Sequence, residues 1–206
     1  MGGGIMSAKT AIEQIDFFDT DFNYIGQSSI DEIHQKGLWH QTVACWLYNP
    51  QRKVVYLQLR GPKNRVGPNT FDASSSGHLS AGERKEDGFR ELFEELGVSA
   101  DSKQAHYLGY FKNIAYLSNY TNNEFCHIYL VPTNKVLSDF VFQDGEVSNI
   151  FELKIANIDD LLMGEEVEIY SQSEKRKITI QNMCIYKERV ENGYYKWVFE
   201  AIKEKL

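Results

Sequence analysis

The stretch from Gly77 to Val98 is GHLSAGERKEDGFRELFEELGV, and it decides how the rest of the chain is interpreted. A glycine-containing loop leads into apolar residues at helical spacing, and Gly97 follows the last of them as a helix-ending cap. Positions i, i+3, i+4 and i+7 lie on one face of an α-helix, so the pattern predicts one buried stripe. The members of that stripe are Phe89, Leu92, Phe93 and Leu96.

Three carboxylates, Glu91, Glu94 and Glu95, are predicted to share the opposite, exposed face of this helix. Like charges one turn apart repel each other unless a cation lies among them. Arg90 adjoins the group, and carboxylate oxygens are the hard ligands that Mg²⁺ or Mn²⁺ prefers. The pattern therefore indicates a divalent-metal site, with a solvated acidic helix as the alternative.

These residues resemble the Nudix box, the family pattern Gly-x5-Glu-x7-Arg-Glu-U-x-Glu-Glu-x-Gly-U, where U is a bulky aliphatic residue. The resemblance is carried by Gly77, Glu83, Arg90, Glu91, Leu92, Glu94, Glu95, Gly97 and Val98. Six residues separate Glu83 from Arg90 where the family has seven, which leaves the placement of Glu83 open.

The resemblance implies an α/β fold, a Nudix-type α/β/α sandwich with a mixed β-sheet, to which this chain adds C-terminal helices. It also implies that Glu91, Glu94, Glu95 and the Gly77 carbonyl bind metal, and that Arg90 orients the carboxylates.

The composition fits one domain with elaborations, since the chain has 206 residues of which 42% are hydrophobic. A net charge of −7 argues against a basic surface for nucleic-acid polymers. Three scattered cysteines predict neither disulfides nor a zinc site, and no membrane span or signal peptide is recognisable. We therefore expect a cytoplasmic protein whose partner is a small-molecule diphosphate.

Runs of β-branched and aromatic residues, together with helical spacing, predict the remaining elements. We expect a hairpin within 13–26, a polar connector at 29–37, and strands at 39–48, 54–60, 106–112, 124–131 and 147–153. Loops are expected at 61–76, with a short strand near Phe71, and at 113–123. Helices are expected at 158–163 and, as a pair separated near Gly193, within 179–206.

This order of elements predicts three parts of the chain. They are an N-terminal hairpin and connector at 1–35, a Nudix domain at 36–165 and a C-terminal helical extension at 166–206. The tail is rich in aromatic residues, which would suit the surface of a homodimer.

A second set of residues resembles the isopentenyl-diphosphate isomerase branch of the same family. It comprises Gly37-Leu38-Trp39-His40, Leu57-Gln58-Leu59-Arg60, Lys63, Pro68, Phe71-Asp72 and Ser76-Gly77-His78. Those isomerases move protons with a Cys and a Glu, at whose positions this chain has Ser76 and Asn122. A hydroxyl and an amide do not readily exchange protons at carbon, so we expect a hydrolase instead.

The isomerase resemblance also makes His40 and His78 candidate metal ligands, with hydrogen-bonded structural histidines as the alternative. Arg60 and Lys63 follow a predicted strand and are candidates for binding substrate phosphates, although ordinary surface charge explains them equally well. Glu146 lies on a loop where several Nudix hydrolases carry an additional metal ligand or base. Glu124 is a weaker candidate of the same kind.

The predicted function is Mg²⁺-dependent hydrolysis, with Mn²⁺ as a possible substitute, of a nucleoside diphosphate-linked or related organic diphosphate. The general base is open between Glu91, Glu94 and Glu146. Two alternatives remain, an isomerase-like enzyme and a non-catalytic nucleotide sensor. Four aromatic residues are candidates for stacking on a base, although most such residues belong to the core. They are Trp39, Trp46, Phe71 and Tyr116.

Overall fold

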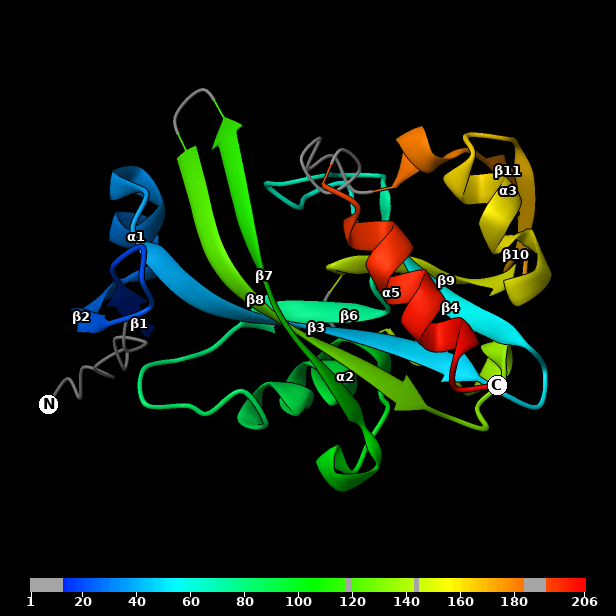
Figure 1. Cartoon of the computed structure of the whole chain (residues 1–206), viewed down its shortest axis with the longest axis horizontal. Helices are drawn as coiled ribbons and strands as arrows, with labels where there is room; N and C mark the ends of the chain where they lie inside the picture. Colours follow the sequence, from blue (N-terminus) through cyan, green and yellow to red (C-terminus); the bar gives the residue numbers. More distant parts are fainter. Residues whose placement is uncertain (1–12, 118–119, 143–144, 184–191) are drawn as a thin grey trace, which may run out of the picture.

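The computed structural model describes residues 13–117, 120–142, 145–183 and 192–206 (Figure 1). In these ranges a large β-sheet runs through the molecule. The helix α2 (Arg90–Leu96) packs against one face of the sheet, and α5 (Tyr194–Lys203) packs against the other. This is the α/β/α sandwich that the sequence predicts, and the fold class is confirmed.

The strands follow the chain in the order β1 (Gln14–Phe18), β2 (Tyr24–Ser29), β3 (Trp39–Asn49), β4 (Val54–Arg60), β5 (Phe71–Asp72), β6 (Ser75–His78), β7 (His106–Leu117), β8 (Tyr120–Pro132), β9 (Val147–Lys154), β10 (Val167–Tyr170) and β11 (Lys175–Ile178). The other helices are α1 (Ile30–Lys36) and α3 (Ile158–Leu162), with the single-turn helices η1 (Asp87–Phe89), η2 (Ser102–Gln104), η3 (Leu137–Asp139), η4 (Ile155–Asn157) and η5 (Ile180–Asn182).

β3 is the strand around which the sheet is assembled. One of its edges pairs in parallel with β8 along almost its whole length. Its other edge pairs in succession with β1, β6 and β4, and all three of these strands are antiparallel to it. Beyond β4 the sheet continues through β9 and β10 to β11. The sheet is mixed, as expected.

Alternate residues of β3 enter two different hydrophobic cores. Val43 and Leu47 pack on the side of α2, together with Leu92. Trp46 packs on the opposite side with Phe199 of α5. Burial on both faces explains why this strand is a continuous run of apolar residues in the sequence.

The predicted hairpin at 13–26 and the predicted strands are present, but several other segments differ from expectation. The prediction of a polar connector at 29–37 is wrong, because α1 occupies most of these residues. The hydroxyl of Ser29 accepts a hydrogen bond from the Glu32 amide at its start, and Gly37 adopts φ 62° at its end. Its inward side, Ile33 and His34, is too short and too polar to give a clear helical pattern.

The prediction of a loop at 113–123 is also wrong for the part of this range that the structure describes. β7 and β8 extend as a long antiparallel hairpin, with Asn113 opposite Glu124 and Leu117 opposite Tyr120. In Figure 1 this hairpin projects beside α1. Polar residues that point into the protein, such as Asn113 and Asn122, conceal the strand from a search for apolar runs. β6 likewise begins inside the segment expected to be a loop at 61–76.

The C-terminal part, 166–206, adds strands as well as a helix. β10 and β11 extend the sheet, and α5 begins after Gly193, the expected break. The other expected helix falls largely on residues outside the described ranges. Tyr194, Tyr195 and Phe199 are at most 1% exposed, so these aromatic residues build the core rather than a surface for a homodimer. No helix in the described ranges is both long and apolar enough to cross a membrane.

Candidate active site

A cavity of about 680 Å³ opens between α1, α2, β6, β8 and the loop that follows β4. The predicted site residues Gly77, Glu91 and Glu94 lie on one part of its wall, and Arg60 and Lys63 lie on another. The structure thus brings together residues from separate parts of the sequence, and Glu146, Glu124 and His78 are among the other lining residues.

The helix α2 holds the acidic side of this cavity. It ends at Gly97, which adopts φ 66° and donates to the carbonyl groups of the last turn. The buried arc runs from Glu95 through Leu92 to the preceding Phe89. Phe93, placed in the buried stripe by the sequence pattern, lies beyond this arc and is 54% exposed, so that prediction is wrong.

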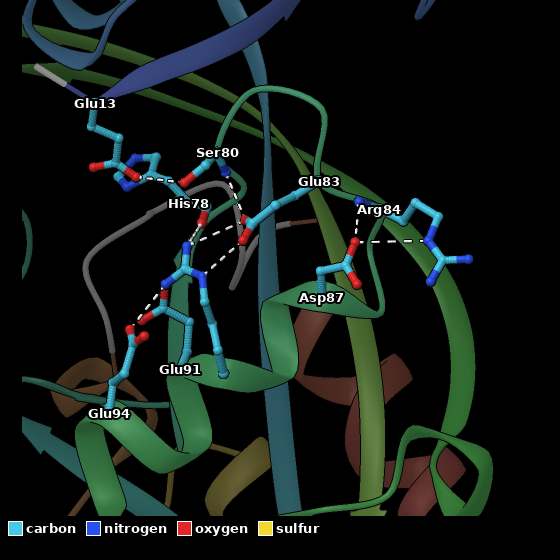
Figure 2. A network of polar contacts seen from close by, with 9 residues as sticks. Glu13, His78, Ser80, Glu83, Arg84, Asp87, Glu91 and Glu94 are labelled. Atoms are coloured by element: carbon cyan, nitrogen blue, oxygen red, sulfur yellow. Dashed lines mark hydrogen bonds and ion pairs between the residues drawn. The ribbon is translucent and has the colours of Figure 1, made fainter. Parts of the chain in front are cut away.

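Arg90 is the centre of an ion-pair network. Figure 2 labels its partners Glu83, Glu91 and Glu94. The Nε of Arg90 donates to Glu83 Oε1 at 3.0 Å, and its Nη1 donates to Glu91 Oε1 at 2.5 Å and Glu94 Oε2 at 2.9 Å. Its Nη2 donates to the carbonyl oxygen of His78 at 2.9 Å. The shorter spacing between Glu83 and Arg90 therefore does not separate these two side chains.

Glu95 is 2% exposed, which corrects the expectation that all three carboxylates share an exposed face. Its Oε2 accepts from the Ser76 amide at 3.2 Å. Burial raises the pKa of Glu95 well above its ordinary value, and the nearby charge of Glu91 acts in the same direction. Amphipathic spacing gives no sign that a carboxylate belongs to the buried arc.

Glu91 is nearly as enclosed, with 13% of its side chain exposed. Burial raises its pKa to about 7, Arg90 opposes this, and Glu94 and Glu146 add to it. Gly77 lies directly against it, since a Cβ atom at position 77 would stand 2.2 Å from the Glu91 carboxyl carbon. Only glycine fits this approach.

The side-chain types on α2 suit a hard divalent cation. Glu91 and Glu94 line the cavity with carboxylate oxygens, and Gly77 brings its backbone against Glu91. Glu95 is buried and is not among the lining residues. Burial disfavours the charged forms of Glu91 and Glu95 and raises the pKa of each. A bound cation would favour those charged forms.

The loop after β4 carries the cations of the cavity. Arg60 donates from Nε to the Val66 carbonyl at 3.0 Å, and Lys63 is exposed at the rim. Arg65, which the sequence analysis missed, also lines the cavity and pairs with Asp31 of α1 at 3.3 Å. Nothing in the local sequence distinguishes Arg65 from ordinary surface charge.

Glu146 lies just before β9, with its side chain exposed beside the cavity. Its charge raises the pKa of Glu91, which shows that the two carboxylates are near each other. Its backbone carbonyl accepts from the Gly61 amide and from Asn64 Nδ2, both at 2.7 Å. The loop with Glu146 and the cationic loop are therefore joined.

A second group of possible ligands lies in the same cavity region. The rings of His34, His40 and His78 bring one nitrogen each within 4.8 Å of one another. Both ring nitrogens of His34, and Nε2 of His40 and His78, are buried and have no hydrogen-bond partner. Burial lowers the pKa of His34 and His78 to about 3, so both rings are neutral at pH 7. His34 escaped prediction because α1 itself did.

Glu124 lies beside this histidine group and is 7% exposed. It accepts from Asn113 Nδ2 at 2.9 Å and from Asn122 Nδ2 at 2.6 Å. Burial lowers the pKa of His40, and the charge of Glu124 opposes that shift. Asn122, at the isomerase Glu position, thus serves as a hydrogen-bond donor to Glu124. Ser76 also lines the cavity.

None of the four aromatic residues considered for base stacking lines the cavity. Trp46 and Phe71 are core residues, Trp39 packs on Phe125, and Tyr116 is 75% exposed. Tyr120 does line the cavity, where its ring lies 4.2 Å from that of His34.

An α/β/α sandwich that gathers carboxylates and cations around one cavity has the parts of an enzyme that acts on phosphate groups. The NUDIX domain model matches residues 38–175, and the chain therefore belongs to the Nudix family. The match includes every predicted site residue, covers β10 and ends at the first residue of β11.

Relatives agree with this assignment. An uncharacterised Nudix hydrolase of Clostridium acetobutylicum is 32% identical over 201 residues, which cover 93% of this chain and 98% of that protein. The isopentenyl-diphosphate Delta-isomerase of Serratia proteamaculans is 30% identical over 119 residues, 57% of this chain and 65% of that protein. A crystal structure from Deinococcus radiodurans shares the fold, with TM-score 0.57 and 21% identity over 74% of this chain and 91% of that chain. The chain is a Nudix-type diphosphate hydrolase.

Proposed function

We propose that this enzyme is a Mg²⁺-dependent hydrolase of a nucleoside diphosphate-linked or related organic diphosphate. The observation that carries the proposal is that Glu91 and Glu94 of α2 line a cavity whose other wall bears Arg60, Lys63 and Arg65. Negative ligands on one side suit a metal, and cations on the other suit the phosphates of the substrate.

The residues divide the work of hydrolysis between them. Glu91, Glu94, Glu95 and the Gly77 carbonyl hold Mg²⁺, which when bound neutralises phosphate charge and lowers the pKa of water. Arg90 fixes the orientation of Glu91 and Glu94 through its guanidinium group.

Among the three candidate bases, we favour Glu146. Glu91 and Glu94 are both held by Arg90 and are assigned to the metal, whereas Glu146 faces them from another loop. In the reaction, Glu146 accepts a proton from the water whose oxygen attacks phosphorus. The P–O bond to the bridging oxygen breaks, and that oxygen leaves with the departing phosphate. Arg60 and Lys63 bind the substrate phosphates and hold them in line for this attack.

A phosphate-release screen with and without Mg²⁺ tests the proposal. The panel contains nucleoside diphosphates and triphosphates, sugar nucleotides, dinucleoside polyphosphates, coenzyme A and isoprenoid diphosphates. Glu95→Gln should lower turnover by roughly two orders of magnitude or more because it removes a metal ligand. Glu200→Gln, on the exposed side of α5, is the matched control. Near-normal turnover of the Glu95 variant would contradict the metal assignment.

The alternatives give different results in the same screen. Conversion of isopentenyl diphosphate to dimethylallyl diphosphate would support an isomerase, which Ser76 and Asn122 disfavour. Tight binding of a panel member without any cleavage would support a sensor, which the intact carboxylate group disfavours.

We also propose a second metal site at His34, His40 and His78, with Glu124 beside it. Neutral imidazoles with buried, unpartnered nitrogens suit a borderline ion such as Zn²⁺ better than Mg²⁺. Metal analysis of the purified protein should find a stoichiometric ion that is lost in His34→Asn and retained in His106→Asn, whose histidine is exposed. Binding that survives His34→Asn would contradict this assignment.

A further inference from the structure

The side chain of Asn64 joins the cationic loop to the loop that carries Glu146. Its Nδ2 donates to the Glu146 carbonyl at 2.7 Å and to the Gly61 carbonyl at 3.1 Å. Its Oδ1 accepts from Arg60 Nη2 at 3.4 Å. One amide therefore contacts both the guanidinium expected to bind phosphate and the backbone of the proposed base.

The backbones of the two loops are close at the same point. Arg60 is paired with Val147 at the end of the β4–β9 ladder, and the Gly61 amide donates to the Glu146 carbonyl at 2.7 Å. A Cβ atom at position 61 would lie 2.4 Å from the Gly145 carbonyl oxygen, so this contact leaves no room for a side chain. The approach is built into the fold, and Asn64 is the side chain that reinforces it.

We propose that Asn64 is a positioning residue that fixes the Glu146 carboxylate relative to the phosphate held by Arg60. This inference rests on the proposed function, in which Glu146 is the base and Arg60 binds substrate. Asn64 itself needs no contact with the reacting atoms. Its effect comes through the Glu146 backbone on one side and the Arg60 guanidinium on the other.

The chemistry of the amide explains why asparagine suits this position. An Asn side chain donates and accepts at once, whereas an ionised Asp accepts only. Asn64→Asp therefore keeps an acceptor for Arg60 but places a carboxylate oxygen against the Glu146 carbonyl. Asn64→Ala removes both contacts. The two variants thus separate the Glu146 contact from the Arg60 contact.

The test measures kcat and KM with the substrate that the screen identifies. Asn64→Asp should lower kcat about tenfold while KM changes by less than about twofold, because a misplaced base affects the chemical step. Asn64→Ala should lower kcat similarly and also raise KM. Asn69→Asp, which adds the same charge to an exposed position of the same loop, should leave both constants unchanged.

A double-mutant cycle with Glu146→Gln distinguishes positioning from a general structural role. If Asn64 acts through Glu146, Asn64→Asp should have no further effect on kcat once Glu146 is Gln. Additive losses of kcat in the double variant, or a kcat of Asn64→Asp equal to that of wild type, would overturn the inference. The proposed function would remain intact in either case, because the wild-type protein still cleaves the substrate. Absence of any cleavage by the wild-type protein would overturn both together.

Discussion

Glu91→Gln should stabilise the metal-free protein at alkaline pH while it removes activity. The pKa of Glu91 is raised from 4.5 to about 7, mainly by burial. The folded state therefore holds a proton that the unfolded chain releases, and the stability tied to this group falls as pH rises from about 4.5 to about 7. At about 1.4 kcal/mol for each pH unit, the ionised side chain destabilises the folded protein by about 3 kcal/mol at pH 8.

The measurement is urea unfolding of wild type and Glu91→Gln in the presence of a chelator. Because other groups titrate as well, the informative quantity is the difference in unfolding free energy between the two proteins. That difference should favour the variant and grow by about 2 kcal/mol between about pH 5.5 and about pH 8. Glu91→Gln also weakens the hydrogen bond from Arg90, which lowers the stability of the variant at every pH. This loss changes the pH dependence of the difference in unfolding free energy only slightly.

Added Mg²⁺ provides the control. Under the proposed function the ion binds the folded protein through ionised carboxylates, so saturating Mg²⁺ should stabilise wild type more than the variant, and most strongly at high pH. A difference that is independent of pH in the chelator would refute the assignment of Glu91 as an enclosed carboxylate with a raised pKa. Equal stabilisation of both proteins by Mg²⁺ would refute its role as a ligand.

Two other perturbations follow from the same geometry. Gly77→Ala places a methyl group 2.2 Å from the Glu91 carboxyl carbon. The Mg²⁺ concentration for half-maximal activity should therefore rise at least about tenfold in a metal titration. An unchanged titration would contradict the close approach. Burial lowers the pKa of His34 to about 3, so below about pH 6.5 the unfolded chain takes up a proton that the folded state rejects. The metal-free protein therefore loses stability as the pH falls, and His34→Gln should reduce that loss. If the free energy of unfolding of the variant falls with acid pH as much as that of wild type, the burial of a neutral His34 ring is contradicted.

Local rules were enough to predict most of the fold. Strands such as β3 and β4 are long apolar runs, and α2 has both an apolar stripe and a glycine cap. The elements that escaped prediction, α1 and the outer half of the β7–β8 hairpin, bury polar residues in place of apolar ones. His34 and Asn113 are examples, each at most 3% exposed. A search for hydrophobic periodicity has no means of finding such residues.

The same limit applies to the site. A long motif with ordered spacing was enough to find the carboxylates of α2 and Arg90. Arg65, Asn64 and His34 join the cavity only through contacts between distant parts of the chain, and each is an ordinary polar residue in its own segment. Glu95 shows the reverse case, because the motif singles it out while helical spacing wrongly assigns it to the exposed face of α2.

The two candidate metal sites meet at β6, where adjacent residues serve different sites. Gly77 lies against Glu91 of the carboxylate group, while the ring of His78 belongs to the histidine group. Arg90 connects them further, because it holds Glu91 and Glu94 and also donates to the His78 carbonyl. A shift of β6 by either metal must therefore move a ligand of the other. We expect the occupancy of the histidine site to change the Mg²⁺ dependence of hydrolysis, and a Mg²⁺ titration of His34→Asn beside wild type measures that coupling directly.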